Sequence, residues 1–309
     1  MSESNKRNFI VHGSILAIAG ILVRIIGMLY RIPVVNIIGS EGNGIYGAAF
    51  NIYNIMLVLS SYGLPMAVSK LVSARFTKKR YKSAAKVLRC SLMVAVCTGG
   101  IAALLVFFGA SFIENVIYGG GLPGLAVPLR ILAPTIFLVA ILGVIRGFFQ
   151  GQSTMIPTAV SQILEQIVNA IVSIAAGYGM MKAFASSPDV AAYGAAGSTL
   201  GTAMGALTAV LFMGFLYAVY TPTFNRLKRK DRHTENQSTG QICKIIIYTM
   251  IPIILGQTFY QISALIDDVM FSNIMVGRDI TKSISMDLGN FSSSYSLLIG
   301  IPQGVASAM

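Results

Sequence analysis

An apolar run with two arginines inside it, residues 13–31 (GSILAIAGILVRIIGMLYR), constrains this chain more than any other feature. The run is long enough to cross a bilayer as a helix. Small and basic residues recur along it at steps of four and three, which places them on one face of that helix. They are Gly13, Ala17, Gly20, Arg24, Gly27 and Arg31.

The guanidinium groups of Arg24 and Arg31 would project from this face about 10 Å apart. An arginine at bilayer depth costs from about 2.5 to more than about 10 kcal/mol. We therefore expect the face to meet protein or a water-filled cavity rather than lipid. Its small residues would let another helix approach closely.

The composition indicates an all-α polytopic membrane protein. Of the 309 residues, 55% are hydrophobic and 11% are charged, whereas a soluble domain carries about 25% charged residues. The net charge of +12 lies in short loops between apolar runs, which is a topology pattern rather than a nucleic-acid signal. Three cysteines and two histidines without ligand spacing predict no metal site, no cofactor and no enzyme.

Apolar runs predict about eight transmembrane helices. They lie at approximately 9–32, 45–72, 87–112, 125–149, 155–181, 194–220, 242–275 and 288–309. Pro65, Pro134 and Pro252 fall inside these runs, where we expect them to kink or break the helix. The loops at 75–86 and 226–232 are strongly basic and lie on the side of the N-terminus, so we expect that side to be cytoplasmic.

A weak internal repeat suggests two lobes. GLPMAVS at 63–69 is similar to GIPQGVA at 300–306, six helices later, as in parallel repeats of transporters. We expect a first six-helix lobe at 1–220, a basic cytoplasmic loop at 221–241, and the first two helices of a second lobe at 242–309. Because the chain ends inside the eighth run, it is predicted to be the N-terminal part of a longer protein.

Ionisable residues at membrane depth are candidates for a functional site. Besides Arg24 and Arg31, the candidates for a cavity are Gln162, Glu165 and Gln261, which lie on polar faces of the fifth and seventh runs. Glu165 has a plainer alternative as a protonated or salt-bridged packing residue. Arg146 lies near the end of the fourth run, and we expect it to reach the membrane surface.

Counting residues along the first and seventh runs places Arg31 at a depth similar to that of Asp267 and Asp268. If these helices face each other, an ion pair between Arg31 and one aspartate could close a gate. The alternative for the two aspartates is an ordinary position at the membrane interface.

Several motifs resemble those of the polysaccharide biosynthesis protein family. They are the run RIPVVNIIGSEGNGIYGAAFNIYNIMLVLSSYGLPMAVSK at 31–70, RGFFQG at 146–151, MIPTA at 155–159 and QILEQ at 162–166. More narrowly, the chain resembles the stage V sporulation protein B type, a relative of lipid II flippases in the multidrug/oligosaccharidyl-lipid/polysaccharide exporter superfamily. The resemblance implies 12–14 helices in two lobes that work by alternating access. It also implies a cationic cavity lined by first-helix arginines, for which Arg24 matches well and Arg31 matches with a one-residue shift.

Three functions are consistent with these features. The leading one is a flippase or exporter of an undecaprenyl-pyrophosphate-linked saccharide or peptidoglycan precursor in the bacterial cytoplasmic membrane, where Na⁺ or H⁺ could drive the cycle. A cation-coupled exporter of drugs or metabolites would instead use Glu165 and the aspartates. A scaffold for cell-wall or spore-coat synthesis proteins would use Arg24 only to bind a partner helix.

Overall fold

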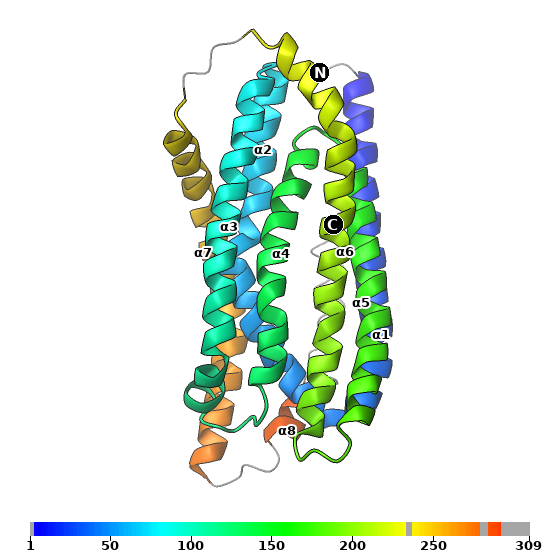
Figure 1. Cartoon of the computed structure of the whole chain (residues 1–309), viewed down its shortest axis with the longest axis vertical. Helices are drawn as coiled ribbons and strands as arrows, with labels where there is room; N and C mark the ends of the chain where they lie inside the picture. The colour runs from blue at the N-terminus through cyan, green and yellow to red at the C-terminus, as the bar shows by residue number, and fades with distance from the viewer. Residues whose placement is uncertain (1–2, 233–236, 279–283, 292–309) are drawn as a thin grey trace.

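The computed structural model describes residues 3–232, 237–278 and 284–291, which form an elongated bundle of helices (Figure 1). No strand occurs among these residues. The helices are α1 (Glu3–Leu57), α2 (Gly63–Thr77), α3 (Tyr81–Phe112), α4 (Ala126–Gln150), α5 (Ile156–Ala183), α6 (Val190–Lys230), α7 (Thr239–Gly277) and α8 (Ile284–Asn290). Two π-helical turns, η1 (Val58–Tyr62) and η2 (Ile113–Ile117), follow α1 and α3.

Helix α1 consists of two arms that reverse direction at Gly39 (Figure 1). This residue has φ 70° and ψ 178°, a conformation that glycine adopts and other residues avoid. The first arm runs the length of the bundle, and the second arm returns through η1 into α2. The two predicted passes at 9–32 and 45–72 are confirmed. The predicted loop between them is wrong, because the chain stays helical up to Gly39 and again after it.

Six stretches of the described chain are long and apolar enough to cross a membrane, and the first of them, Ser14–Thr77, contains the second pass and all but the start of the first. The predicted runs from 87 to 275 match α3 to α7 within a few residues at most ends. The chain is therefore a multi-pass helical membrane protein. The predicted eighth run, 288–309, and the second copy of the repeat at 300–306 lie outside the described residues, apart from 288–291.

The basic segment predicted as a loop at 221–241 is largely helical, because α6 continues to Lys230. Phe224 explains the extension: it is buried and packs against the rings of Phe76 of α2 and Phe148 of α4, with centroids 6.1 and 5.3 Å away. Lysine and arginine in the last turn are also favourable at the negative end of the helix dipole. The division of the chain into lobes stays a prediction.

The prolines interrupt the helices less than their positions predict. Pro65 is the third residue of α2, directly after the π-helical turn, so the α-helical pattern is interrupted there although the chain stays helical. In contrast, α4 continues through Pro134 and α7 through Pro252, so neither proline breaks its helix. A kink at these positions stays a prediction. A helix in an apolar medium keeps its remaining backbone bonds, and its neighbours support the residue that loses one.

The bundle has one apolar core near each end. Ile45, Tyr118 and Leu129 belong to the core at the end where α1 reverses. Leu64, Phe148 and Ile246 belong to the other core, which joins α2, α4 and the start of α7. Because lipid chains are as apolar as these side chains, the cores stabilise the bundle mainly through close van der Waals packing.

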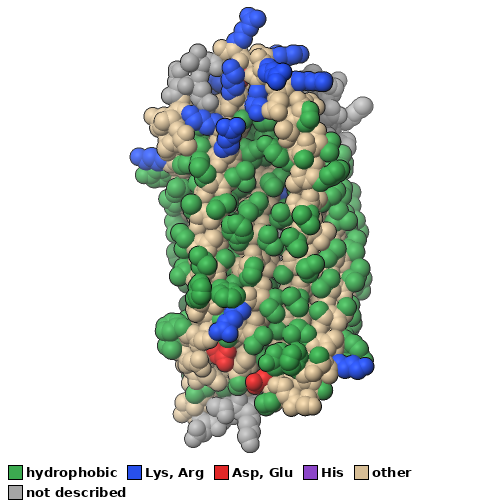
Figure 2. All heavy atoms as spheres, in the orientation of Figure 1, with side chains coloured by type: hydrophobic (Ala, Val, Ile, Leu, Met, Phe, Trp, Pro, Cys, Tyr) green, Lys and Arg blue, Asp and Glu red, His purple; other side chains and the backbone are tan. Residues whose placement is uncertain are grey.

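Basic side chains gather at one end of the molecule, while hydrophobic side chains cover its length (Figure 2). The basic end contains the connection from α2 to α3 and the last turn of α6, and it is also the end of the N-terminus (Figure 1). The structure thus confirms that the two basic loops lie on the same side of the bundle.

Helices α5 and α6 approach closely through glycines on α6. Gly197, Gly201 and Gly205 follow one another at four-residue steps. A Cβ atom on Gly201 would overlap Ser173 of α5, and one on Gly205 would lie 2.6 Å from the backbone oxygen of Glu165. Small residues at such steps are typical of close helix pairs in membranes.

The glycine contact predicts a specific loss of stability. We expect Gly201→Ala to destabilise the protein by about 1–3 kcal/mol, because the new methyl group forces α5 and α6 apart. The matched control is Gly214→Ala on the same helix, where a Cβ meets no atom within 4 Å. Thermal unfolding in detergent should show a lower midpoint for the first variant only. Equal loss in both variants would contradict the close contact.

Candidate functional site

The polar face predicted on α5 meets three neighbouring helices rather than a single cavity. Gln162, Glu165 and Gln166 are all partly buried. Glu165 turns towards α4, whereas Gln166 and Asn169 turn towards α1. The spacing of polar residues along α5 predicted the face, but the pattern gave no information about which neighbour each side chain meets.

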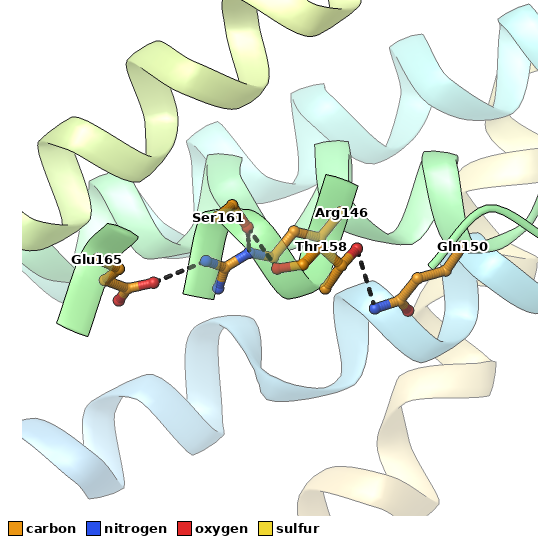
Figure 3. Close-up of polar contacts among 5 residues, drawn as sticks. All are labelled: Arg146, Gln150, Thr158, Ser161 and Glu165. Atoms are coloured by element: carbon orange, nitrogen blue, oxygen red, sulfur yellow. Dashed lines mark hydrogen bonds and ion pairs between the residues drawn. The ribbon is translucent and has the colours of Figure 1, made fainter. Parts of the chain in front are cut away.

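Arg146 and Glu165 form an ion pair between α4 and α5 (Figure 3). The Nη2 atom of Arg146 lies 2.7 Å from Oε2 of Glu165, and its Nε donates to the Ser161 hydroxyl at 2.9 Å. The side chains are 14% and 27% exposed. The prediction that Arg146 reaches the membrane surface is therefore wrong, because a carboxylate and a hydroxyl on α5 hold its guanidinium inside the bundle.

Asn169 and Ser173 connect α5 to α1 and α6. The Asn169 amide donates to the Tyr30 hydroxyl at 3.4 Å. The Ser173 hydroxyl lies 2.9 Å from Oδ1 of Asn169 and 2.8 Å from the backbone oxygen of Ser198. These contacts satisfy polar groups that would otherwise be costly to bury. Tyr30 was not singled out from the sequence, although it directly precedes Arg31.

The stripe on the first arm of α1 packs against protein along only part of its length. A Cβ on Gly27 would lie 3.2 Å from Nε2 of Gln166, so α5 approaches here as the small residues predicted. At Gly20 a Cβ would meet no atom within 4 Å. Arg24 lies between these two positions, and its side chain is exposed. Arg24 thus marks the point where the stripe changes from packed to open.

Arg31 has a different environment from Arg24. Its guanidinium carbon lies 5.8 Å from the ring centroid of Tyr46, on the returning arm of α1. A cation above a tyrosine ring is stabilised by about 0.5–2 kcal/mol. The Nε atom of Arg31 is buried and has no hydrogen-bond partner among the described residues. Arg24 and Arg31 therefore lie on the same helix face but in different environments.

On α7, Asp268 is bonded to α1. Its Oδ2 atom accepts a hydrogen bond of 2.5 Å from Asn51, on the returning arm. Asp267 is exposed, and Gln261 is partly buried about two turns closer to the basic end. Arg31 thus contacts Tyr46, whereas Asp268 is bonded to Asn51. Arg31 and Asp268 do not form an ion pair with each other in this structure. The gate between them stays a prediction.

No group of three or more histidine, cysteine, aspartate or glutamate side chains in the described part of the chain could hold a metal ion. The site is instead a set of arginines and amides spread over α1, α4 and α5, with two carboxylates on α7. Guanidinium groups are donors that suit carboxylate and phosphate oxygens.

Comparison with known families agrees with this architecture. The family model described as polysaccharide biosynthesis protein matches residues 10–309. The chain belongs to this family. It is 34% identical over 176 residues to the lipid II flippase MurJ of Bacillus subtilis (strain 168), a match that covers 55% of this chain and 32% of the flippase. It is 30% identical over 210 residues to stage V sporulation protein B of the same organism. That match covers 67% of this chain and 39% of the sporulation protein.

Solved structures show the same fold. An inward-facing multidrug resistance transporter of the MATE family, in the MOP superfamily, superposes with a TM-score of 0.65 over 94% of this chain and 64% of that one, at 16% identity. The chain spans about a third to two fifths of the length of the two curated relatives. The family and the exporter-type fold predicted from the motifs are thus confirmed.

The ion pair of Arg146 with Glu165 predicts coupled energetics. We expect Arg146→Gln and Glu165→Gln each to destabilise the protein, because each leaves the remaining charge partly buried without its partner. The double variant should lose about 0.5–3 kcal/mol less than the sum of the two. A double-mutant cycle by thermal unfolding measures this coupling. Strictly additive losses would show that the pair contributes no coupling energy.

The gate hypothesis predicts rescue by charge exchange. Arg31→Asp and Asp268→Arg should each abolish transport, and the two together should restore it if the side chains pair during the cycle. The matching exchange with Asp267 tests the other aspartate. The measurement is flux of the transported substrate into vesicles, and failure of rescue in both combinations would remove the gate.

Proposed function

We propose that the protein to which this chain belongs is a flippase that moves a lipid-linked anionic precursor, of the undecaprenyl-pyrophosphate type, across the bacterial cytoplasmic membrane. The ion pair of Arg146 with Glu165 is the observation that carries the proposal. In this pair Arg146 neutralises the Glu165 carboxylate of α5 within the bundle. The Arg24 side chain, on neighbouring α1, is exposed. A ligand at this surface would therefore meet a cation first.

Pyrophosphate is a suitable ligand for such a surface. A guanidinium offers a planar fork of donors that bonds two phosphate oxygens at once. The charged head group would enter between helices, while the polyprenyl chain stays in the bilayer. Binding would also offset part of the cost of holding Arg24 at membrane depth. This links occupancy of the site to closure of the surrounding helices.

The relatives support this substrate class in general terms. One is a lipid II flippase and another a stage V sporulation protein, and both are family relatives at modest identity. In the proposed orientation the N-terminus and the basic end face the cytoplasm, as the positive-inside rule favours. The cycle would need no resident cofactor and would use a Na⁺ or H⁺ gradient. Flux measured with one gradient removed at a time assigns the ion. Partner proteins in this proposal would be those of cell-wall synthesis.

A cation-coupled exporter is the second candidate, and the carboxylates on α7 favour it. Asp267 is exposed, and Asp268 has one oxygen engaged by Asn51. In this case cation flux, rather than precursor binding, would depend on acidic residues. A scaffold without transport is the third candidate. In that case neither precursor binding nor cation flux would be measured.

The effect of Arg24 variants on precursor binding tests the proposal. We expect Arg24→Ala to weaken binding of lipid II at least tenfold, because a hydrogen-bonded charge contributes about 1.5–3 kcal/mol. Arg24→Lys should recover only part of the loss, since an ammonium lacks the planar fork. The control is Arg130→Ala. It removes an exposed arginine that donates to Ser111 near the end of the bundle opposite the basic end.

The same preparations discriminate the candidates. Normal binding by Arg24→Ala would overturn the flippase proposal. Loss of organic-cation export in Glu165→Gln or Asp268→Asn, with precursor binding intact, would establish the exporter instead.

A further inference from the structure

A cavity opens at the basic end of the molecule, where the start of α3 lies beside the end of α6 and the start of α7. Its volume is about 420 Å³, within the range of about 300–1,000 Å³ that is usual for ligand sites. Four basic side chains line it together with apolar and hydroxyl groups. The basic residues are Lys82, Lys86, Arg89 and Lys228, and the others include Met93 and Thr239. The cavity is separate from Arg24 and from the ion pair of α5.

The charge of this cavity is strongly positive. Among the described residues that line it, none is acidic. Asp231 is close in the fold, but its carboxylate is buried and accepts the backbone N–H of Lys82 at 2.8 Å. That carboxylate therefore caps the start of α3 and is not one of the lining groups. An anion is the ligand that complements these four cations.

Two of the amines are held in place by their neighbours. The Lys86 ammonium donates to the backbone oxygen of Gln237 at 2.5 Å. The Lys228 ammonium lies 5.2 Å from the ring centroid of Phe224, which is itself buried. An ammonium has three N–H donors, so Lys86 keeps two for a ligand. Such preorganisation reduces the entropy lost on binding.

A stripe of exposed apolar side chains leads from the cavity along α3. Its members occupy about 140° of the circumference of α3, centred near the cavity residue Met93, and each is about half exposed or more. They are Val96 (47%), Ile101 (60%), Leu104 (58%) and Phe108 (76%). Because α3 is long and apolar enough to cross the membrane, acyl chains are the natural neighbours of this stripe.

We propose that this cavity binds the phosphate head group of an anionic phospholipid, whose acyl chains lie along the α3 stripe. The cations match the phosphodiester charge, and the stripe matches the chains below it. Basic pockets between helices at a membrane surface take lipid head groups for the same reason. The inference depends on the chain lying in a membrane and is independent of the transported substrate.

The absence of tryptophan from the sequence allows a direct test. Val96→Trp places a single fluorophore on the stripe just below the cavity, and Phe215→Trp places one on exposed α6. The protein is reconstituted with lipids whose chains are brominated and quench nearby tryptophan. We expect brominated phosphatidylglycerol to quench the Trp at position 96 more strongly than brominated phosphatidylcholine. The reporter at position 215 should show little difference.

Charge variants assign the preference to the cavity. Lys86→Gln together with Arg89→Gln should reduce the preference for phosphatidylglycerol at least fivefold, since each basic residue near a membrane surface contributes about fivefold in affinity. Lys78→Gln together with Arg229→Gln removes two exposed charges of the same end outside the cavity, and it should leave the preference intact. Quenching by brominated phosphatidylcholine shows that each variant is inserted, and its thermal unfolding midpoint shows that it is folded.

Three outcomes would overturn the proposal. Equal loss in the two charge pairs would mean that general surface charge attracts the lipid. Absence of quenching at position 96 by either lipid would mean that protein covers the stripe. Displacement of phosphatidylglycerol by soluble glycerol phosphate at similar concentration would mean that the cavity takes free phosphate esters and not a lipid.

Discussion

The ion pair of Arg146 with Glu165 joins α4 to α5 inside the bundle. A charge in an apolar bundle is costly unless it is paired and hydrogen-bonded, and here the Ser161 hydroxyl completes the arrangement. The pair and the glycine contacts with α6 are compatible with the same rotation of α5 about its axis. Once Glu165 faces α4, Gln166 and Asn169 face α1, and the backbone of α5 lies against the glycines of α6.

The same constraint organises the rest of the charge. Most basic residues lie at one end, where water and lipid head groups can solvate them (Figure 2), and four of them line the cavity for which we propose a lipid phosphate. Within the membrane-spanning part, Arg31 lies on an aromatic ring and Asp268 on an amide. Arg24 is exposed on its helix.

Particular elements show why part of the fold was predictable. Helices α4 and α5 begin and end within two residues of the predicted runs, because a long apolar run in a membrane has no alternative to a helix. Local rules failed where packing decided. Residues 221–230 read as a basic loop, yet Phe224 finds two aromatic partners on distant helices and extends α6. Pro134 and Pro252 lie within continuous helices because a helix in an apolar medium keeps its remaining backbone bonds.

The sequence by itself determined that this is a helical membrane protein, which end of it is basic, and which family it belongs to, because hydropathy, charge in loops and short motifs are local properties. Only the tertiary structure decided that Arg146 pairs with Glu165, that Asp268 is bonded to Asn51, and that Lys86 and Lys228 line one cavity. These pairs are separated by 19, 217 and more than a hundred residues along the chain. Helix packing brings them together, and no local pattern encodes which faces of two helices meet.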